Sequence, residues 1–169
     1  MKQTFDIRNE LTVEVDILPD AGNLRFMRDP NQKGANRYVE HTYDFDGRVV
    51  LQRTCSGSLP SPSDLTATCS SPLQSITYIY DDASVGSGVG FTVNNALGRL
   101  TRVTFQGGYY LYSYNANGQV ERMYNKLDGL SGKTVHYNYN RLGEPIHVQY
   151  QPGASDSHYW WYTYDQPGR

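Results

Sequence analysis

The two cysteines are the residues whose spacing most directly indicates chemistry. Cys55 and Cys69 flank a stretch of Ser, Pro, Thr and Gly with almost no apolar content. A disulfide between them would close the base of this loop and stabilise the fold by roughly 3 kcal/mol through loop-closure entropy. The alternative is two unrelated thiols. Zinc would need further ligands, and because no histidine lies in or beside the loop, we predict no metal site.

Other polar residues give no second site. The chain has four histidines: His41, His136, His147 and His158. They fall on different predicted strands, so we expect half-exposed strand residues and not a helical metal site. The segment Asp44 to Gly47 resembles the start of a calcium loop, but the ligand series does not continue and a turn is the better interpretation. Gly86 to Gly90 lacks the lysine and helix of a phosphate loop. No nucleophile and base occur together, so we predict no catalytic residue, no cofactor and no enzyme activity.

Aromatic side chains are the remaining candidates for binding. The sequence holds 15 tyrosines, five phenylalanines and two tryptophans. Aromatic rings can pack on the apolar faces of sugars, and Tyr159, Trp160 and Trp161 are the candidates for such glycan stacking. The alternative is cross-strand packing, because paired aromatics stabilise β-sheets.

The segment from Tyr112 to Val120 predicts the hairpin that positions such aromatics. Tyr112 and Tyr114 share one face of an extended strand, because side chains alternate with a period of two. Asn115 and Gly118 then suit a type I turn, since an Asn side chain bonds the turn backbone and glycine adopts positive φ without strain. Val120 begins the return strand.

This hairpin recurs along the chain. The turn glycines Gly118, Gly143 and Gly168 are 25 residues apart, and Gly22 and Gly47 have the same spacing. A fixed period of this length indicates a repeat architecture in which each unit buries its face only against its neighbours. No segment shows sustained helical periodicity, so we predict an all-β fold.

Alternating patterns place the strands along one domain. We predict strands over residues 9–18, 24–27, 37–45, 48–55, 76–81, 91–94, 99–105, 109–115, 120–124, 133–140, 146–150 and 158–165. Residues 29–34 are predicted to be loop, and 55–75 a loop insertion after which the repeats resume. A degenerate copy follows Asp81, and residues 91–100 form another copy with one extra turn residue. We expect a single domain over 1–169, with weak repeats over 1–36 and clearer repeats over 37–169.

Composition excludes several classes of partner. A net charge of -2 gives no basic surface for nucleic acid. No apolar run is long enough for membrane insertion, and residues 1–6 do not resemble a signal peptide. Tyrosine packs its ring while its hydroxyl stays in water, so a chain with a mean hydropathy of -0.63 can still form a core.

At the turns, the pattern Tyr-x-Tyr-Asp-x-x-Gly-Arg-Val resembles the YD repeat of the Rhs family. This family includes bacterial Rhs polymorphic toxins, shell components of insecticidal Tc toxin complexes, and animal teneurins. The copy at Asp44 fits fully, two copies have Asn in place of Asp, and Glu144 and Pro145 replace the usual Arg and apolar residue. The residues that define the repeat are Tyr43, Asp44, Gly47, Arg48, Tyr112, Tyr114, Asn115, Gly118, Tyr137, Tyr139, Asn140, Gly143, Tyr162, Tyr164, Asp165 and Gly168.

The resemblance implies an antiparallel β-sheet of stacked hairpins, arranged as an open, curved or spiralling strap. We expect the Arg after the turn glycine to reach a carboxylate or carbonyl of a neighbouring turn. The unfinished copy from Tyr162 to Arg169 leads us to expect a fragment of a longer protein.

The implied role is structural, in an exported bacterial protein that is secreted or at the cell surface. The segment would form part of a β-shell that encloses or presents toxin cargo, with the remainder of its parent chain and an enclosed toxin segment as partners. The alternative is a surface module for adhesion that binds carbohydrate or protein, with glycans as partners. Exposed edge strands would also allow self-association.

Overall fold

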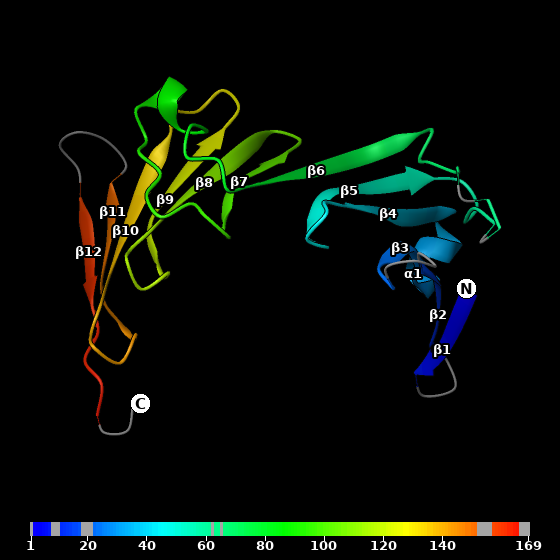
Figure 1. Ribbon diagram of the computed structural model, residues 1–169, viewed down its shortest axis with the longest axis horizontal. Helices are drawn as coiled ribbons and strands as arrows, with labels where there is room; N and C mark the ends of the chain where they lie inside the picture. The colour runs from blue at the N-terminus through cyan, green and yellow to red at the C-terminus, as the bar shows by residue number, and fades with distance from the viewer. Residues whose placement is uncertain are drawn as a thin grey trace. The chain divides into compact units, whose positions relative to one another are not determined.

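Twelve β-strands make up most of the regular structure. The computed structural model describes residues 2–7, 11–17, 22–61, 63–64, 66–151 and 157–165, with side chains from Glu14 onward (Figure 1). The strands are β1 (Lys2–Ile7), β2 (Leu11–Ile17), β3 (Leu24–Arg28), β4 (Arg37–Tyr43), β5 (Val49–Ser56), β6 (Pro72–Tyr80), β7 (Leu100–Phe105), β8 (Gly108–Tyr114), β9 (Val120–Leu127), β10 (Lys133–Tyr139), β11 (Pro145–Gln151) and β12 (His158–Trp161). The described residues also form a short helix, α1 (Pro30–Gly34), and a 3-10 turn (Ser87–Val89). No helix among them is long and apolar enough to cross a membrane.

The strand order follows the order of the sequence from β1 to β12. The strand pairs with a defined register are antiparallel throughout. The predicted all-β antiparallel fold without substantial helix is therefore confirmed. The curvature of a complete strap stays a prediction.

Two local predictions near the N-terminus differ from the structure. Strand β1 was not expected, and the strand predicted over residues 9–18 is β2, with 9, 10 and 18 outside the described residues. The loop predicted over 29–34 contains α1, because Asp29 caps its first turn. The Asp29 carboxylate accepts from the Gln32 backbone N–H at 2.7 Å, and the Gln32 side chain accepts from the Asp29 N–H at 2.9 Å. This reciprocal capping box is the sequence signal that was overlooked.

The chain divides into two compact units, Met1–Thr77 and Tyr78–Arg169. In the first unit, the buried cluster consists of Phe26, Tyr38, Cys55 and Cys69, with the partly buried Leu59 and Ala67 packed against it. The rings of Phe26 and Tyr38 meet edge to face at 5.6 Å. Strands β3, β4 and β5 supply one side of this core, and the loop between β5 and β6 supplies the other. That loop spans residues 57–71, which is shorter than the predicted 55–75.

The second unit has a core built in the same way. Its buried cluster consists of Phe91, Val93, Ala96 and Leu111, with the partly buried Val85, Tyr109 and Tyr124 packed against it. The strand predicted over 91–94 is wrong, because these residues are irregular chain. Phe91 and Val93 alternate as in a strand, but they bury their side chains against the sheet residue Leu111. A sheet must bury its apolar face against a second layer, and here the two long loops supply it.

A β-bulge accompanies three of the turns. The register shifts between Thr42 and Tyr43, between Ser113 and Tyr114, and between Asn138 and Tyr139. Each shift leaves one extra residue on the return strand and disrupts the ladder locally. The repeat therefore consists of an aromatic strand, a tight turn and a bulged return strand.

Candidate functional site

The turn at Asn115 is built around one side chain. Asn115 Oδ1 accepts from the backbone N–H groups of Asn117 and Gln119, each at 3.0 Å. The Asn115 N–H donates to the Gln119 carbonyl at 2.9 Å, and the Gly118 N–H donates to the Asn115 carbonyl at 3.0 Å. One amide oxygen therefore pairs two turn N–H groups that the strands cannot reach.

The turns at Asp44 and Asn140 repeat this arrangement. Asp44 Oδ1 accepts from the backbone N–H groups two and four residues later, at 3.0 and 2.9 Å. Asn140 Oδ1 accepts from the corresponding groups at 2.9 and 3.0 Å. Because Asp and Asn present the same Oδ1 acceptor, both residues suit this position.

The residue after the turn glycine pairs with the first residue of its own turn. Arg48 Nε donates to Asp44 Oδ2 at 2.7 Å. In the turn at Asn115 the Asn115 amide donates to Gln119 Oε1 at 2.9 Å. The Asn140 amide donates to Glu144 Oε2 at 2.7 Å. Donor and acceptor thus exchange sides when Asn replaces Asp, which explains why Glu144 can occupy the usual Arg position.

The residue after the turn glycine also connects successive turns. Gln119 Nε2 donates to the Gly143 carbonyl of the following turn at 3.2 Å. Arg48 pairs with Asp44 and Asp46 of its own turn, and the contact expected between the Arg and a neighbouring turn stays a prediction. At Gly118, where φ is +83°, an added Cβ would lie 2.7 Å from the Arg99 guanidinium of the preceding turn. Gly118 therefore provides both the left-handed backbone and the space for its neighbour.

In four repeats the second tyrosine forms a bond that the sequence did not indicate. Its hydroxyl donates to the carbonyl of the first residue of the preceding strand in the sheet order. The pairs are Tyr43 with Leu24, Tyr114 with Leu100, Tyr139 with Val120 and Tyr164 with Pro145, at 2.6, 2.6, 2.7 and 2.6 Å. In three of these pairs the two residues are 19 positions apart in the sequence, a constant interval that could have revealed the bond. We call this contact the tyrosine latch.

The tyrosine latch acts where the backbone ladder ends. Between β9 and β10 the last paired residues are Arg122 and His136. Beyond that pair, the Tyr139 hydroxyl reaches the Val120 carbonyl next to the bulge. The hydroxyl thus gives this part-buried carbonyl a hydrogen-bond partner where the backbone ladder does not. Burial raises the pKa of Tyr43, Tyr114 and Tyr139, so these hydroxyls stay protonated at neutral pH.

The first tyrosines of the repeats support the strands by packing. Tyr112 and Tyr137 lie half-buried on β8 and β10, opposite Met123 and Val148. Burial raises the pKa of both hydroxyls.

The last predicted repeat is described only in part. Tyr162 is 46% exposed, and Asp165 follows the latched Tyr164. Gly168 lies outside the described residues.

The two degenerate copies predicted after Asp81 are one repeat with a long insertion. The Asp81 N–H donates to the Arg99 carbonyl at 3.0 Å, and its carboxylate accepts from the Gly98 N–H. These are the contacts of a turn that begins at Asp81 and ends at Gly98. The separate copy predicted over 91–100 is therefore wrong. Residues 82–97 leave this turn and cover the sheet, where Arg122 donates to the Thr92 carbonyl at 2.8 Å.

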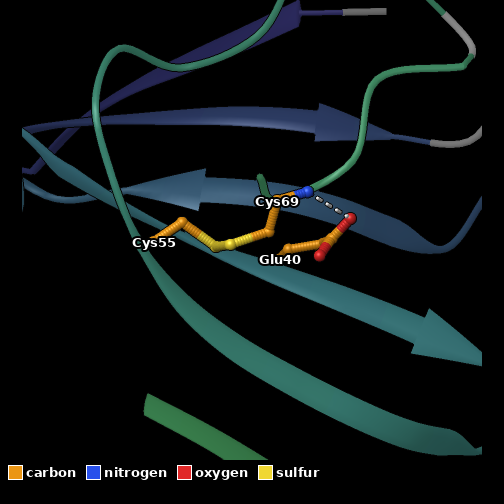
Figure 2. Close-up of side chains that lie close together, drawn as sticks. All are labelled: Glu40, Cys55 and Cys69. Atoms are coloured by element: carbon orange, nitrogen blue, oxygen red, sulfur yellow. Dashed lines mark hydrogen bonds between the residues drawn. A yellow bond between two sulfur atoms is a disulfide. The ribbon is translucent and has the colours of Figure 1, made fainter. Parts of the chain in front are cut away.

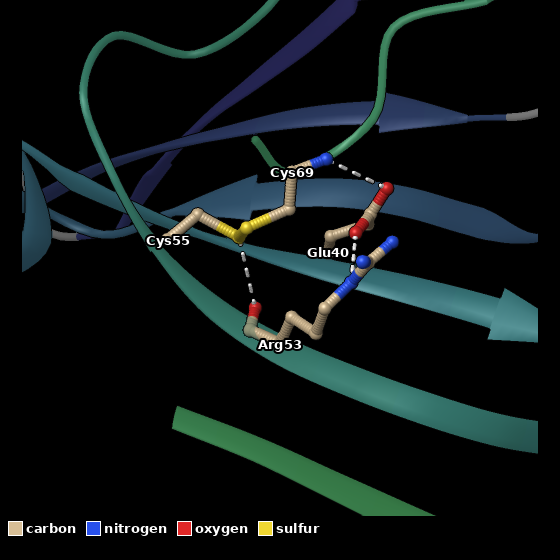
Figure 3. The surroundings of a disulfide bond; sticks show 4 residues. All are labelled: Glu40, Arg53, Cys55 and Cys69. Carbon is tan, nitrogen blue, oxygen red and sulfur yellow. Dashed lines mark hydrogen bonds and ion pairs between the residues drawn. A yellow bond between two sulfur atoms is a disulfide. The ribbon is translucent and has the colours of Figure 1, made fainter. Parts of the chain in front are cut away.

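The loop over residues 57–71, which we call the stapled lid, is held by a disulfide between Cys55 and Cys69. Figure 2 shows Glu40 of β4 beside this bond, with one carboxylate oxygen accepting from the Cys69 N–H at 3.3 Å. Its other oxygen accepts from Arg53 Nε at 2.7 Å (Figure 3). Glu40 is only 5% exposed, so its charge is compensated inside the fold by Arg53.

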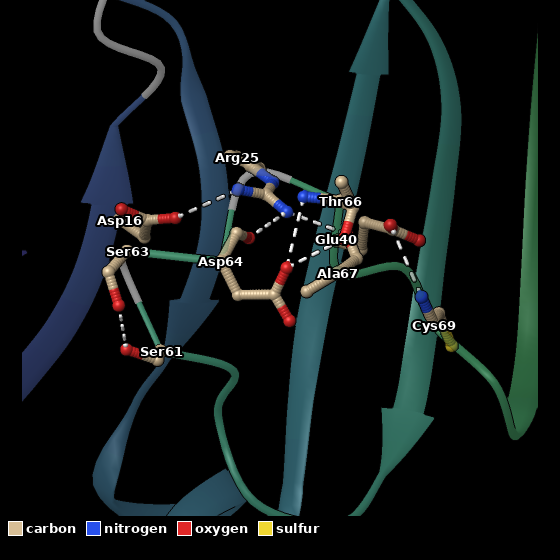
Figure 4. Close-up of polar contacts among 9 residues, drawn as sticks. All are labelled: Asp16, Arg25, Glu40, Ser61, Ser63, Asp64, Thr66, Ala67 and Cys69. Atoms are coloured by element: carbon tan, nitrogen blue, oxygen red, sulfur yellow. Dashed lines mark hydrogen bonds and ion pairs between the residues drawn. The ribbon is translucent and has the colours of Figure 1, made fainter.

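Arg25 provides a further anchor for the stapled lid. It is 6% exposed and donates to the carbonyls of Asp64 and Ala67, at 2.9 and 2.6 Å (Figure 4). The buried Asp16 carboxylate lies 3.7 Å from the same guanidinium. Arg25 is the extra residue of a bulge in β3, which explains how it and the adjacent Phe26 are both buried. Neither Arg25 nor Glu40 was predicted as a functional residue, because no local motif marks them.

The other predicted candidates lie on strands of their own. Tyr159, Trp160 and Trp161 on β12 are 53%, 49% and 74% exposed. His147 was expected to be half-exposed, but it is buried and stacks on Tyr159 with ring centroids 5.5 Å apart. The other three histidines lie on β4, β10 and β12 without forming a cluster in the described residues.

Comparisons with known proteins gave matches among solved structures. No protein-family model matches the chain, and no curated protein matches it. Among solved structures, it is similar to a chain in the crystal structure of TcdB2-TccC3-Cdc42, with a TM-score of 0.32 and 12% sequence identity. The match covers 88% of this chain and 11% of that chain.

Replacing Gly118 with alanine tests the turn. Gly118→Ala should lower the free energy of unfolding by about 1–2 kcal/mol, because an L-residue is strained in the left-handed region. Urea unfolding followed by circular dichroism measures this. The control is Gly88→Ala, where φ is not left-handed and an added Cβ meets nothing within 4 Å. Equal stability of the two variants would contradict the turn.

Removing one hydroxyl tests the tyrosine latch. Tyr139→Phe should cost about 0.5–1.5 kcal/mol at pH 7, because the Val120 carbonyl loses its partner. A raised tyrosine pKa stabilises the fold fully below the unfolded value of 10.0, and this contribution is lost as pH rises through the folded value. Stability should therefore fall above about pH 10, and less steeply in Tyr139→Phe.

The control for this variant is Tyr159→Phe. Tyr159 is 53% exposed, and its hydroxyl accepts from the Gln149 side chain at 3.2 Å. Urea unfolding at pH 7 and at alkaline pH should show little difference between this control and the unmodified chain. If Tyr139→Phe behaves like the control at both pH values, the latch does not stabilise the fold.

Proposed function

We propose that this chain is a structural YD-repeat segment of a larger exported bacterial protein, in which it forms part of a β-shell wall. One observation carries the proposal: the Asx-bonded turn and the tyrosine latch recur with the same atoms along the chain. Side chains that repeat in this way stabilise the sheet, because each copy contacts the neighbouring copy. They do not converge on one shared binding or catalytic site.

Repetition explains how such a wall would be extended. Each latch joins an aromatic strand to the strand before it, and Arg99 and Gln119, which follow turn glycines, lie against the next turn. An added unit can therefore fold by contacting its neighbouring unit alone, as in other repeat proteins. In this function the wall encloses or presents toxin cargo, with the rest of the parent chain and that cargo as partners.

An oxidising location agrees with the stapled lid. Disulfides persist in secreted and cell-surface proteins and are rare in the reducing cytosol. The Cys55–Cys69 bond lies in a buried core, where it joins the lid to β5. This bond supports the proposed location outside the cytoplasm, secreted or at the cell surface.

Duplicating one unit tests the structural function. A copy of residues 119–143 inserted after Gly143 adds one return strand, one aromatic strand and one turn, with the latch of Tyr139 included. We expect a folded chain with more β-structure by circular dichroism. Its urea unfolding should remain cooperative, with a larger dependence on denaturant, because more surface is exposed on unfolding.

The matched control duplicates residues 120–143, which is one residue shorter. A shift by one residue moves every following side chain to the opposite face of the sheet, so this variant should lose stability or aggregate. Identical behaviour of the two insertions would count against a repeat that fixes register, and so would misfolding of the longer insertion.

Glycan binding is a second candidate function, favoured by the exposure of the β12 aromatics. Trp161 is 74% exposed and lies 4.2 Å from the His147 ring, so its indole is held in place and still faces solvent. Exposed aromatic rings could pack on sugar faces. The structural alternative, cross-strand packing, accounts for the half-buried Tyr109 and Tyr110 better than for Trp161.

A glycan array distinguishes the two functions. Specific binding that is lost in Trp161→Ala, with an unchanged circular dichroism spectrum, would support a binding module. The control is Phe45→Ala, which removes a fully exposed aromatic from a turn. Because we favour the structural function, we expect no specific glycan binding by the unmodified chain.

A further inference from the structure

We propose that reduction of the Cys55–Cys69 disulfide creates a zinc site from the two thiolates and the Glu40 carboxylate. A carboxylate oxygen of Glu40 and the two sulfur atoms all lie within 4.8 Å of one another (Figure 2). All three residues are buried. They come from β4, from β5 and from the end of the stapled lid, so a bound ion would join the lid to two strands.

The ligand types suit zinc. Zn²⁺ binds cysteine sulfur at about 2.3 Å and carboxylate oxygen at about 2.0–2.2 Å in a tetrahedral arrangement. Tetrahedral ligands at these distances are separated by roughly 3.3–3.8 Å. Opening the sulfur–sulfur bond lets the two sulfurs move apart to that separation. Water would fill the fourth position, since many zinc sites combine three protein ligands with water.

The surrounding charge also favours this site. Two thiolates, one carboxylate and Zn²⁺ leave one net negative charge, and the Arg53 guanidinium balances it. Arg53 Nε already donates to Glu40 Oε2 at 2.7 Å, which leaves Oε1 to bind the ion. Oε1 accepts from the Cys69 N–H at 3.3 Å, a contact that directs it toward the sulfurs. Hydrogen bonds of this kind hold ligand carboxylates in place at metal sites.

The redox step needs a reductant and an oxidant from outside the chain. A phosphine and water convert the disulfide into two thiols and a phosphine oxide, and zinc binding then releases two protons. A small disulfide such as oxidised glutathione restores the Cys55–Cys69 bond by exchange, takes up the two electrons as two thiols, and expels the ion. The stapled lid is therefore anchored in both redox states, by a disulfide in one and by zinc in the other. This inference does not depend on the shell function.

Cobalt titration of the full chain tests the site. After reduction with a phosphine, Co²⁺ should bind at one equivalent with thiolate-to-cobalt charge-transfer bands and the intense visible bands of a tetrahedral site. Zn²⁺ should displace it. The oxidised chain should show neither set of bands. Absence of these bands in the reduced chain, with or without a folded circular dichroism spectrum, would overturn the proposal.

Variants then identify the ligands. Cys69→Ser should abolish the charge-transfer bands of the one-to-one complex, and Glu40→Gln should weaken Co²⁺ binding at least tenfold. Asp46→Asn is the control, because it changes an exposed carboxylate of the same unit. The fold of Glu40→Gln is checked in its oxidised form, where the disulfide is intact. If Glu40→Gln binds as tightly as the unmodified chain, Glu40 is not a ligand and the three-residue site is wrong.

Discussion

The carbonyl at the start of each return strand is the group on which the repeat depends. At Leu24, Val120 and Pro145 a bulge follows this residue. The ladder to the next strand ends before reaching it, as the pairs of β9 and β10 show. An unpaired buried carbonyl is costly. The tyrosine hydroxyl satisfies it in four places, with distances between 2.6 and 2.7 Å. Phenylalanine could supply the ring but not this bond, which gives a physical reason for tyrosine at four of its 15 positions.

The two long loops solve a different problem, the burial of a sheet face. Each unit has a small core, and in each the second layer comes from irregular chain. The stapled lid carries few large apolar side chains, so buried polar anchors take their place: Arg25 binds two of its carbonyls and Glu40 binds its Cys69 N–H. The 82–97 segment carries Phe91 and Val93, and it covers the sheet mainly by apolar contact.

Sequence periodicity was sufficient to predict the fold class and most strands, because alternation and turn residues are local signals. It failed where contacts are distant in sequence. Gly98 closes the turn of Asp81 across the whole 82–97 insertion, and no short window contains both residues. Arg25 and Glu40 were missed for the same reason, since their partners in the stapled lid lie 29 to 42 positions away. The loop over 29–34 was a local error, where Asp29 and Gln32 form an ordinary capping box.

The turn pairs show how such a repeat can change its sequence and keep its geometry. The Oδ1 atom of the first turn residue has the same two N–H partners whether that residue is Asp or Asn. The second side-chain atom is an acceptor in Asp and a donor in Asn, so the residue after the glycine must change with it. Asp44 takes a donor from Arg48, whereas Asn115 and Asn140 give one to Gln119 and Glu144. What the repeat preserves is therefore a hydrogen-bonded pair four residues apart, and this pair identifies copies that a fixed Tyr-Asp motif would overlook.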